Sequence, residues 1–336
     1  MSSRRICLVG DMSGNIDEGM KKVTYNIYKE LSKNNEVIVV KPLELVRHKA
    51  KINRFNPDII HYITGPSIFT FGLLKIGAFG LKNVKTVISI SHPQKLFPKP
   101  LISLLKPDMA IVQSDDMDVF FSNLGINTIK ICNGVDLNSF CPVNYQQKSY
   151  LRSKYGIMGD KFVILHVGNI RDGRNLYPLK ELAKNSEFQV VVVASTTIKK
   201  DTRLYNDLVA SNILVIDDYI ENIAEIYNLS DIYVFTVRKR PFAIEVPLSV
   251  MEALACNIPV ITFPFAGLSS FFREGDGLHF ANSDEEIILK VVYAYKFLKH
   301  NQVYFNPRNS VSEYSWSTII TQMQLTYESV LADRCG

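Results

Sequence analysis

The stretch of the chain that decides its fold reads Glu245-Val-Pro-Leu-Ser-Val-Met-Glu252-Ala-Leu-Ala-Cys-Asn257-Ile-Pro-Val-Ile-Thr262. Its large apolar side chains recur at spacings of three and four residues, which predicts a helix with one buried face. Pro247 suits the first turn of this helix, where an N–H has no intrahelical acceptor. Asn257 can take the left-handed conformation that ends a helix, and Pro259 prevents its continuation. A buried strand over residues 258–263 follows, so the stretch predicts a helix that leads into a strand.

Two carboxylates belong to this stretch, Glu245 just before the helix and Glu252 in its second turn. Taken singly, Glu245 is explained as an acidic residue that complements the positive end of a helix. Glu252, also taken singly, is explained as a residue on the solvated face of the helix. Their occurrence together, ahead of a buried strand, instead indicates a binding or catalytic site.

Short apolar runs alternate with amphipathic stretches in both halves of the chain. Near-continuous apolar strands separated by helical patterns indicate parallel sheets with helices on both faces. Ligands of such sheets collect at the carboxyl ends of the strands. The expected strands cover residues 6–10, 36–41, 58–63, 86–91, 108–113, 128–132, 161–167, 188–194, 213–216, 231–236 and 258–263.

Length and composition are those of a soluble protein with two domain cores. The 336 residues are 47% hydrophobic and 21% charged, and the five cysteines are scattered without metal-ligand spacing. We therefore expect reduced thiols and a cytoplasmic protein. The most apolar long run, residues 65–81, is interrupted by Lys75 and is short for a membrane span. We expect it to form a buried helix.

The charge of the chain is uneven. Residues 1–150 contain 19 basic and 12 acidic residues, a net charge of +7, and the remainder has 38 − 19 = 19 basic and 33 − 12 = 21 acidic residues, a net charge of −2. An excess of this kind favours an anionic partner. Residues 94–106 mix lysines with large apolar residues. They fit either a loop and short helix with snorkelling lysines or a surface that touches an anionic membrane.

The segment Glu252-Ala-Leu-Ala-Cys-Asn-Ile-Pro-Val resembles the donor-site signature of GT-B glycosyltransferases, particularly the retaining family 4 (glycosyl transferases group 1). Asn257 stands at the usual glycine, and six residues rather than seven separate Glu245 from Glu252. The resemblance implies two facing, doubly wound, Rossmann-like parallel-sheet domains with a cleft between them. It also implies that Glu252 accepts hydrogen bonds from the donor ribose and that Glu245 contacts the donor sugar.

The diphosphate site of that family has a counterpart in Gly168-Asn169-Ile-Arg171-Asp-Gly-Arg174. The family has Gly-Arg-Leu and a later lysine, whose two cations hold the donor diphosphate. Here Asn169 replaces the arginine, Arg174 falls at the lysine, and Arg171 is a candidate substitute for the missing cation. The amides at the start of the helix, at Leu248 and Ser249, would complete this site.

Further segments resemble the family in the same order along the chain. Gly14 and Gly19 belong to the loop that approaches the donor phosphate and the acceptor, and His92 stands at a strand end near the two sugars. Tyr219 and Ile220 fall where the nucleotide base stacks. The resemblance implies an acceptor-side domain over residues 1–145, a donor-binding domain over 146–310 and a helix over 311–336 that crosses back.

The function implied is retaining, metal-independent transfer of a sugar to a glycan or lipid-linked acceptor. We expect a UDP- or GDP-sugar donor as substrate, no separate cofactor, no nucleic-acid partner and possible peripheral contact with an anionic membrane. Two alternatives stay open. An epimerase of the same fold would act without an acceptor, and a degenerate scaffold would bind nucleotide sugar without turning it over.

Overall fold

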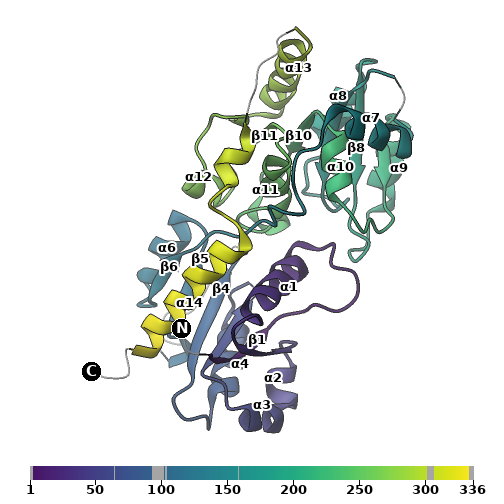
Figure 1. Cartoon of the computed structure of the whole chain (residues 1–336). Helices are drawn as coiled ribbons and strands as arrows, with labels where there is room; N and C mark the ends of the chain where they lie inside the picture. The colour runs from purple at the N-terminus through teal and green to yellow at the C-terminus, as the bar shows by residue number, and fades with distance from the viewer. Residues whose placement is uncertain are drawn as a thin grey trace. The chain divides into compact units, whose positions relative to one another are not determined.

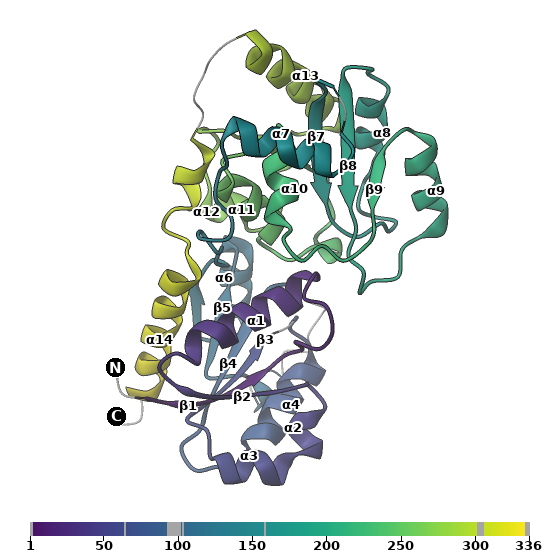
Figure 2. The same cartoon turned by 45° about the vertical axis from the view of Figure 1, so that its right-hand side comes forward.

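The computed structural model describes residues 3–63, 65–92, 102, 104–157, 159–300 and 306–332, with only the backbone of residues 299 and 300. The chain divides into two compact units (Figures 1 and 2). Unit 1 comprises Met1–Gly134, Ile244–Val246 and Trp316–Gly336, and unit 2 comprises Val135–Ala243 and Pro247–Ser315. The division falls at 134 and 315 rather than at 145 and 310, because Val135 pairs with Ser315 and joins both connecting segments to unit 2.

Unit 1 is built on a six-stranded sheet in the order β2-β1-β3-β4-β5-β6, with every neighbouring pair parallel. Its central strand β3 (Ile59–Ile63) is buried at every residue, as expected for a parallel sheet covered on both faces. The other strands are β1 (Arg5–Val9), β2 (Glu36–Val40), β4 (Lys85–Ile90), β5 (Met109–Val112) and β6 (Thr128–Lys130). The described helices are α1 (Gly19–Leu31), α2 (Glu44–Arg47), α3 (Lys49–Phe55), α4 (Ile68–Ala78), α6 (Asp115–Ser122) and α14 (Trp316–Ala332).

Helix α14 closes unit 1 through buried polar contacts. His61 of β3 joins the Tyr327 hydroxyl of α14 through Nδ1, at 2.6 Å, and the Ser89 hydroxyl of β4 through Nε2, at 2.8 Å. Burial lowers the pKa of His61 to about 3, so the ring is neutral near pH 7. Arg4 of the first strand region donates two hydrogen bonds to the Glu328 carboxylate, at 3.0 and 2.7 Å. His61 therefore serves packing between β3, β4 and α14.

Unit 2 repeats the plan with a second parallel sheet in the order β12-β11-β10-β7-β8-β9. The strands are β7 (Phe162–Val167), β8 (Phe188–Val193), β9 (Leu214–Ile216), β10 (Ile232–Phe235), β11 (Val260–Thr262) and β12 (Leu278–Phe280). The helices are α7 (Tyr145–Lys154), α8 (Tyr177–Ala183), α9 (Thr202–Ala210), α10 (Ala224–Leu229), η1 (Arg240–Phe242), α11 (Leu248–Ala255), α12 (Leu268–Phe271), α13 (Asp284–His300) and η2 (Pro307–Val311). The prediction of two parallel sheets flanked by helices is confirmed.

The deciding stretch folds as its pattern predicts, into helix α11 followed by strand β11. Asn257 has a φ of 61°, the left-handed conformation that ends the helix. Pro247 lies one position earlier than predicted, as the N-cap of α11 rather than in its first turn. Its rigid ring still sets the direction in which the chain enters the helix.

The apolar run 65–81 forms a helix as expected, α4 over Ile68–Ala78, but only one side of this helix is buried. Helix α4 buries Phe71 and Leu74, but Phe69 and Phe79 are 60% and 81% exposed. Hydropathy alone made the run look buried, because it does not say how many sides of a helix are covered. In the part of the chain that the structure describes, no helix is long and apolar enough to cross a membrane.

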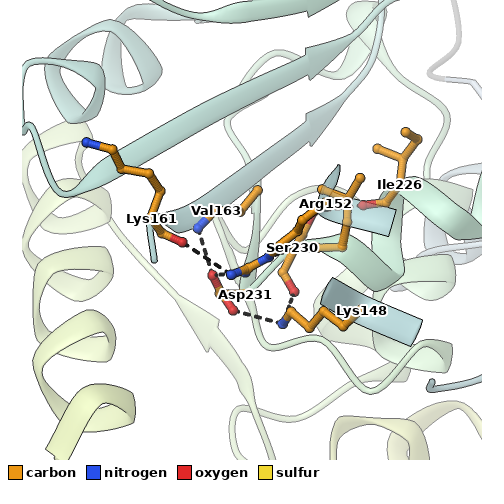
Figure 3. Close-up of polar contacts among 8 residues, drawn as sticks. Lys148, Arg152, Lys161, Val163, Ile226, Ser230 and Asp231 are labelled. Carbon is orange, nitrogen blue, oxygen red and sulfur yellow. Dashed lines mark hydrogen bonds and ion pairs between the residues drawn. The ribbon is translucent and has the colours of Figure 1, made fainter. Parts of the chain in front are cut away.

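A charged network joins helix α7 to the sheet of unit 2 (Figure 3). Asp231, just before β10, accepts a 2.7 Å hydrogen bond from the Val163 N–H. Its carboxylate also pairs with Lys148 at 2.8 Å and with Arg152 at 2.6 Å. Arg152 further donates to the Leu229 carbonyl at 2.9 Å. The Asp231 carboxylate thus accepts a hydrogen bond from Val163, near the start of strand β7, and forms ion pairs with two cations of helix α7.

We predict that Asp231→Asn destabilises unit 2 by about 2 kcal/mol, since two partly buried cations lose their counter-ion. The asparagine keeps an acceptor for Val163, so the fold should survive. Urea unfolding measures the change. The control is Asp207→Asn, whose exposed pair with Lys180 should contribute at most about 1 kcal/mol. Equal effects of the two substitutions would contradict the role given to Asp231.

Candidate functional site

The loop after β7 places a buried cation against a glycine. A Cβ atom on Gly168 would lie 2.8 Å from Nη2 and 3.1 Å from Cζ of Arg174. It would also lie 3.2 Å from Nε2 of His166. Any larger residue at position 168 would therefore displace the guanidinium. Arg174 is only 8% exposed, which is rare for an arginine and indicates a role beyond solubility.

The backbone around Arg174 is held by its neighbours. The Thr236 hydroxyl donates to the Arg174 carbonyl at 3.0 Å. Asn175, at a φ of 54°, donates to the Thr236 carbonyl at 3.2 Å and to the Asp284 carboxylate at 2.7 Å. The Phe242 ring covers Gly173, where a Cβ atom would approach ring carbons to 2.3 Å. The loop is thus fixed from two sides, and Arg174 with it.

His166 and Tyr233 lie beside this cation, and sequence reasoning missed both. His166 is fully buried, and its Nδ1 donates to the Val234 carbonyl at 2.8 Å. Burial and the charge of Arg174 lower the pKa of His166 to about 4, so the ring is neutral near pH 7. Within the described residues its Nε2 atom has no hydrogen-bond partner. The one signal in the sequence was a histidine two residues before Gly168.

Tyr233 connects the β7 loop to the start of α11. Its hydroxyl donates to the Val167 carbonyl at 3.3 Å and forms a hydrogen bond with the Ser249 side chain. Burial raises the pKa of Tyr233, so the phenol keeps its proton. The contact places Ser249, in the first turn of α11, next to the Gly168 loop.

Helix α11 begins next to this loop, and its first backbone N–H groups have no acceptor within the helix. The first intrahelical acceptor is the Pro247 carbonyl, which takes the Val250 N–H at 3.2 Å. The N–H groups of Leu248 and Ser249 precede this bond, as the first amides of any helix do. Aligned amides at a helix start attract anions. Arg174 and the start of α11 therefore concentrate positive potential in one part of unit 2.

Glu252 lies on the same helix and is 5% exposed, so the explanation of a solvated face is wrong. Seven of the eight residues of α11 are buried. The Tyr227 hydroxyl donates to Oε2 of Glu252 at 2.8 Å. Burial and the charge of Glu252 raise the pKa of Tyr227 well above its ordinary value, so this donor is permanent. Sequence reasoning missed Tyr227, which looks like an ordinary core aromatic.

Glu245 belongs to unit 1, not to the same compact unit as Glu252. Its side chain is fully buried, and its N–H donates to the Ser91 carbonyl at 2.8 Å, just after β4. The next residue, Val246, accepts from Asn133 Nδ2 at 2.7 Å. His92 follows Ser91 directly. Glu245 and His92 thus share the carboxyl edge of the unit 1 sheet, where sites of parallel sheets form.

The other predicted residues are positioned less tightly. Gly19 starts α1, with its Cβ position 3.6 Å from Ile244, while Gly14 has a φ of 70° in the preceding loop. Asn169 is half-buried and Arg171 exposed. Tyr219 is 49% exposed and lies beside Ile220 in the loop after β9. The run 94–106 falls largely outside the described residues.

Comparison with known proteins agrees with this geometry. Residues 161–296 match the family model described as glycosyl transferases group 1. No curated protein matches the sequence significantly. Among solved structures, sucrose-phosphate synthase from Thermosynechococcus elongatus superposes with a TM-score of 0.81 at 14% identity, covering 98% of this chain and 100% of that one.

Two further structures show the same fold with nucleotides bound. Anabaena Alr3699/HepE in complex with UDP and glucose matches with a TM-score of 0.75 at 16% identity, covering 97% of this chain and 100% of that one. The catalytic domain of starch synthase IV from Arabidopsis thaliana, bound to ADP and acarbose, gives 0.73 at 11% identity, with coverage of 99% and 100%. The chain therefore has the fold of the GT-B glycosyltransferases, and its residues 161–296 match the family model of the group 1 glycosyl transferases.

Proposed function

We propose that the protein transfers a sugar, with retention of configuration, from a nucleotide-sugar donor to a glycan or lipid-linked acceptor. The observation that carries the proposal is the buried Arg174 guanidinium on Gly168, next to the start of α11. A buried cation beside a helix start suits a bound diphosphate. In a sugar transfer it would also stabilise the leaving group, because the negative charge of the diphosphate grows as its bond to the sugar breaks.

The nucleoside half of the donor is assigned to Glu252. A carboxylate can accept about four hydrogen bonds, and Tyr227 supplies one of them. A carboxylate is therefore a suitable acceptor for the two ribose hydroxyls. Tyr227 also fixes the orientation of the carboxylate, so that a ribose meets a preorganised acceptor. Tyr219 and Ile220, in the loop after β9, are proposed to border the base.

The diphosphate is assigned to Arg174 and to the Leu248 and Ser249 amides, with exposed Arg171 as the second cation in place of Asn169. Fixed donors of this kind each lower a barrier by about 3–4 kcal/mol. His166 is neutral near pH 7, so Arg174 carries the positive charge at this position of the proposed diphosphate site. The arginine charge and the helix start can together do the work of a metal ion, so the proposed reaction requires none.

The sugar and acceptor are assigned to unit 1. His92 and Glu245 lie at the carboxyl edge of its sheet. The loop that contains Gly14 leads into α1, which begins at Gly19. The HepE structures contain UDP, glucose and UDP-glucose, which supports a UDP-sugar as the first donor to test.

A scaffold that binds nucleotide sugar without transfer is the second candidate. Two departures favour it, Asn169 at a position where the family has arginine and the shortened spacing between Glu245 and Glu252. The candidates differ in turnover rather than in binding. An assay for sugar release or transfer therefore separates them.

Binding of a nucleoside diphosphate is the first test. UDP, GDP and ADP are compared by calorimetry and thermal melting, where a ligand at 100 times its Kd should stabilise by about 2.7 kcal/mol. Glu252→Gln should weaken the best ligand about tenfold, since one charge-assisted acceptor is lost. Glu313→Gln, at an exposed position before α14, is the control and should change nothing. Lack of binding by all three nucleotides would end the donor-site proposal.

Turnover is the second test. Arg174→Ala should lower kcat by about 10²–10³, the cost of one preorganised donor at a charged transition state. Arg171→Ala should lower kcat by a smaller factor, and the double variant should nearly abolish transfer. Arg203→Ala, on the exposed side of α9, is the matched control. An Arg171→Ala variant as active as the wild type would remove Arg171 from the proposed diphosphate site, whereas a wild type that binds the donor without any turnover would favour the scaffold.

A further inference from the structure

Helices α2 and α4 of unit 1 pack against each other (Figures 1 and 2), and we call the large exposed apolar side chains on and next to them the apolar face. They pack through Leu45, whose Cδ2 atom lies 2.9 Å from the position of a Cβ on Gly77. Phe69 and Ile76, two turns apart on α4, point to the same side of the helix. The exposed fractions are 81% for Phe79, 60% for Phe69, 50% for Leu43, 49% for Ile76 and 44% for Val46. Five large apolar side chains on two packed helices are more than the single exposed residues of an ordinary surface.

The same part of the chain holds most of the positive charge of the first half. Residues 41–85 carry eight basic and two acidic residues, so they supply +6 of the +7 found in residues 1–150. The basic residues are Lys41, Arg47, Lys49, Lys51, Arg54, Lys75, Lys82 and Lys85, and the acidic residues are Glu44 and Asp58. The apolar face therefore belongs to the most basic segment of the first half of the chain.

A cavity of about 280 Å³ lies next to this face, at the amino edge of the sheet. Three lysines line it, namely Lys75 of α4, Lys85 at the start of β4 and Lys106 before β5. Asp108 is the one carboxylate of the lining, 3.5 Å from the Lys85 ammonium. The Lys106 ammonium donates one hydrogen bond to the Gly125 carbonyl, at 2.8 Å. The cavity has a net positive charge and room for a phosphate group.

The cavity and the apolar face adjoin through α4. Lys75 lines the cavity, and the next residue, Ile76, is exposed on the face. Phe79 follows within one turn, before the chain enters β4 at Lys85. An anionic group in the cavity would thus lie within one helical turn of exposed apolar side chains. Few partners combine a phosphate with an apolar layer at this distance, and a phospholipid surface is one of them.

We propose that the α2–α4 face is a docking surface for an anionic phospholipid membrane. The apolar side chains enter the boundary between headgroups and acyl chains. The surrounding cations meet the negative surface, and the lysine cavity receives a lipid phosphate. Charge excludes a second copy of this chain as the occupant, because a symmetric contact would bring the same cations together. The lysine cavity lies at the opposite edge of the sheet from Ser91 and His92. The proposed docking does not depend on the proposed transferase activity.

Vesicle flotation tests the proposal on the full chain. Vesicles of phosphatidylcholine alone are compared with vesicles in which roughly one-third of the lipid is phosphatidylglycerol. The wild type should float with the anionic vesicles and not with the neutral ones. The double change Ile76→Asp with Phe79→Asp should lower the bound fraction at least about tenfold, since two inserted side chains become charged. Lys75→Glu with Lys82→Glu should lower it by several-fold and reduce its dependence on salt.

The matched control is Tyr293→Asp, a change at a 70% exposed aromatic residue of α13, which should bind vesicles as the wild type does. Thermal melting and nucleotide binding should be unchanged in every variant, so failure here is distinguishable from failure of the proposed function. No flotation of the wild type with anionic vesicles at low salt overturns the proposal. So does undiminished flotation of the Ile76/Phe79 variant. A wild-type dimer that this variant dissociates, without vesicle binding, would overturn it in favour of self-association.

Discussion

The hydrogen bond from Tyr227 to Glu252 keeps a carboxylate inside unit 2, on a helix that is otherwise almost wholly buried. A buried carboxylate without a hydrogen-bond donor would be costly, and it would take up a proton instead. Tyr227 can do this work because its own pKa is raised and its proton stays in place. The position of α11 in turn sets Ser249 against Tyr233, and Tyr233 against the loop that carries Arg174. The proposed donor half of the site is therefore one connected set of buried contacts.

The residues just before α11 bind the chain to a different set of partners. Glu245 and Val246 make backbone hydrogen bonds with Ser91 and Asn133, and the segment Ile244–Val246 belongs to unit 1. Only Val246 and Pro247 then separate Glu245 from the first residue of the helix. Pro247 is restricted at φ, and the Val246 carbonyl is held. Glu245 and Glu252 are thus separated by only six residues, yet the first belongs to unit 1 and the second to unit 2.

Unit 1 presents different chemistry at the two edges of its sheet. The carboxyl edge holds His92 and the buried Glu245, the polar groups proposed to meet sugars. The amino edge holds three lysines around a cavity, and the end of α4 next to this edge exposes Ile76 and Phe79. Parallel strands allow this separation, because all their carboxyl ends meet at one edge and all their amino ends at the other. Unit 1 can therefore bind a sugar at one edge of its sheet and a charged surface at the other, as proposed above.

The sequence by itself predicted the two parallel sheets, because short apolar runs alternate with amphipathic helical stretches in both halves of the chain. It also placed the end of α11 at Asn257, since backbone conformation there depends on local chemistry. Tertiary structure alone showed that His166, Tyr227 and Tyr233 surround the candidate site, because buried aromatic residues look alike until their hydroxyl and ring atoms meet partners. It alone assigned Glu245 to unit 1. Finally, it left one side of α4 exposed, since hydropathy measures what a helix contains and only packing decides which faces are covered.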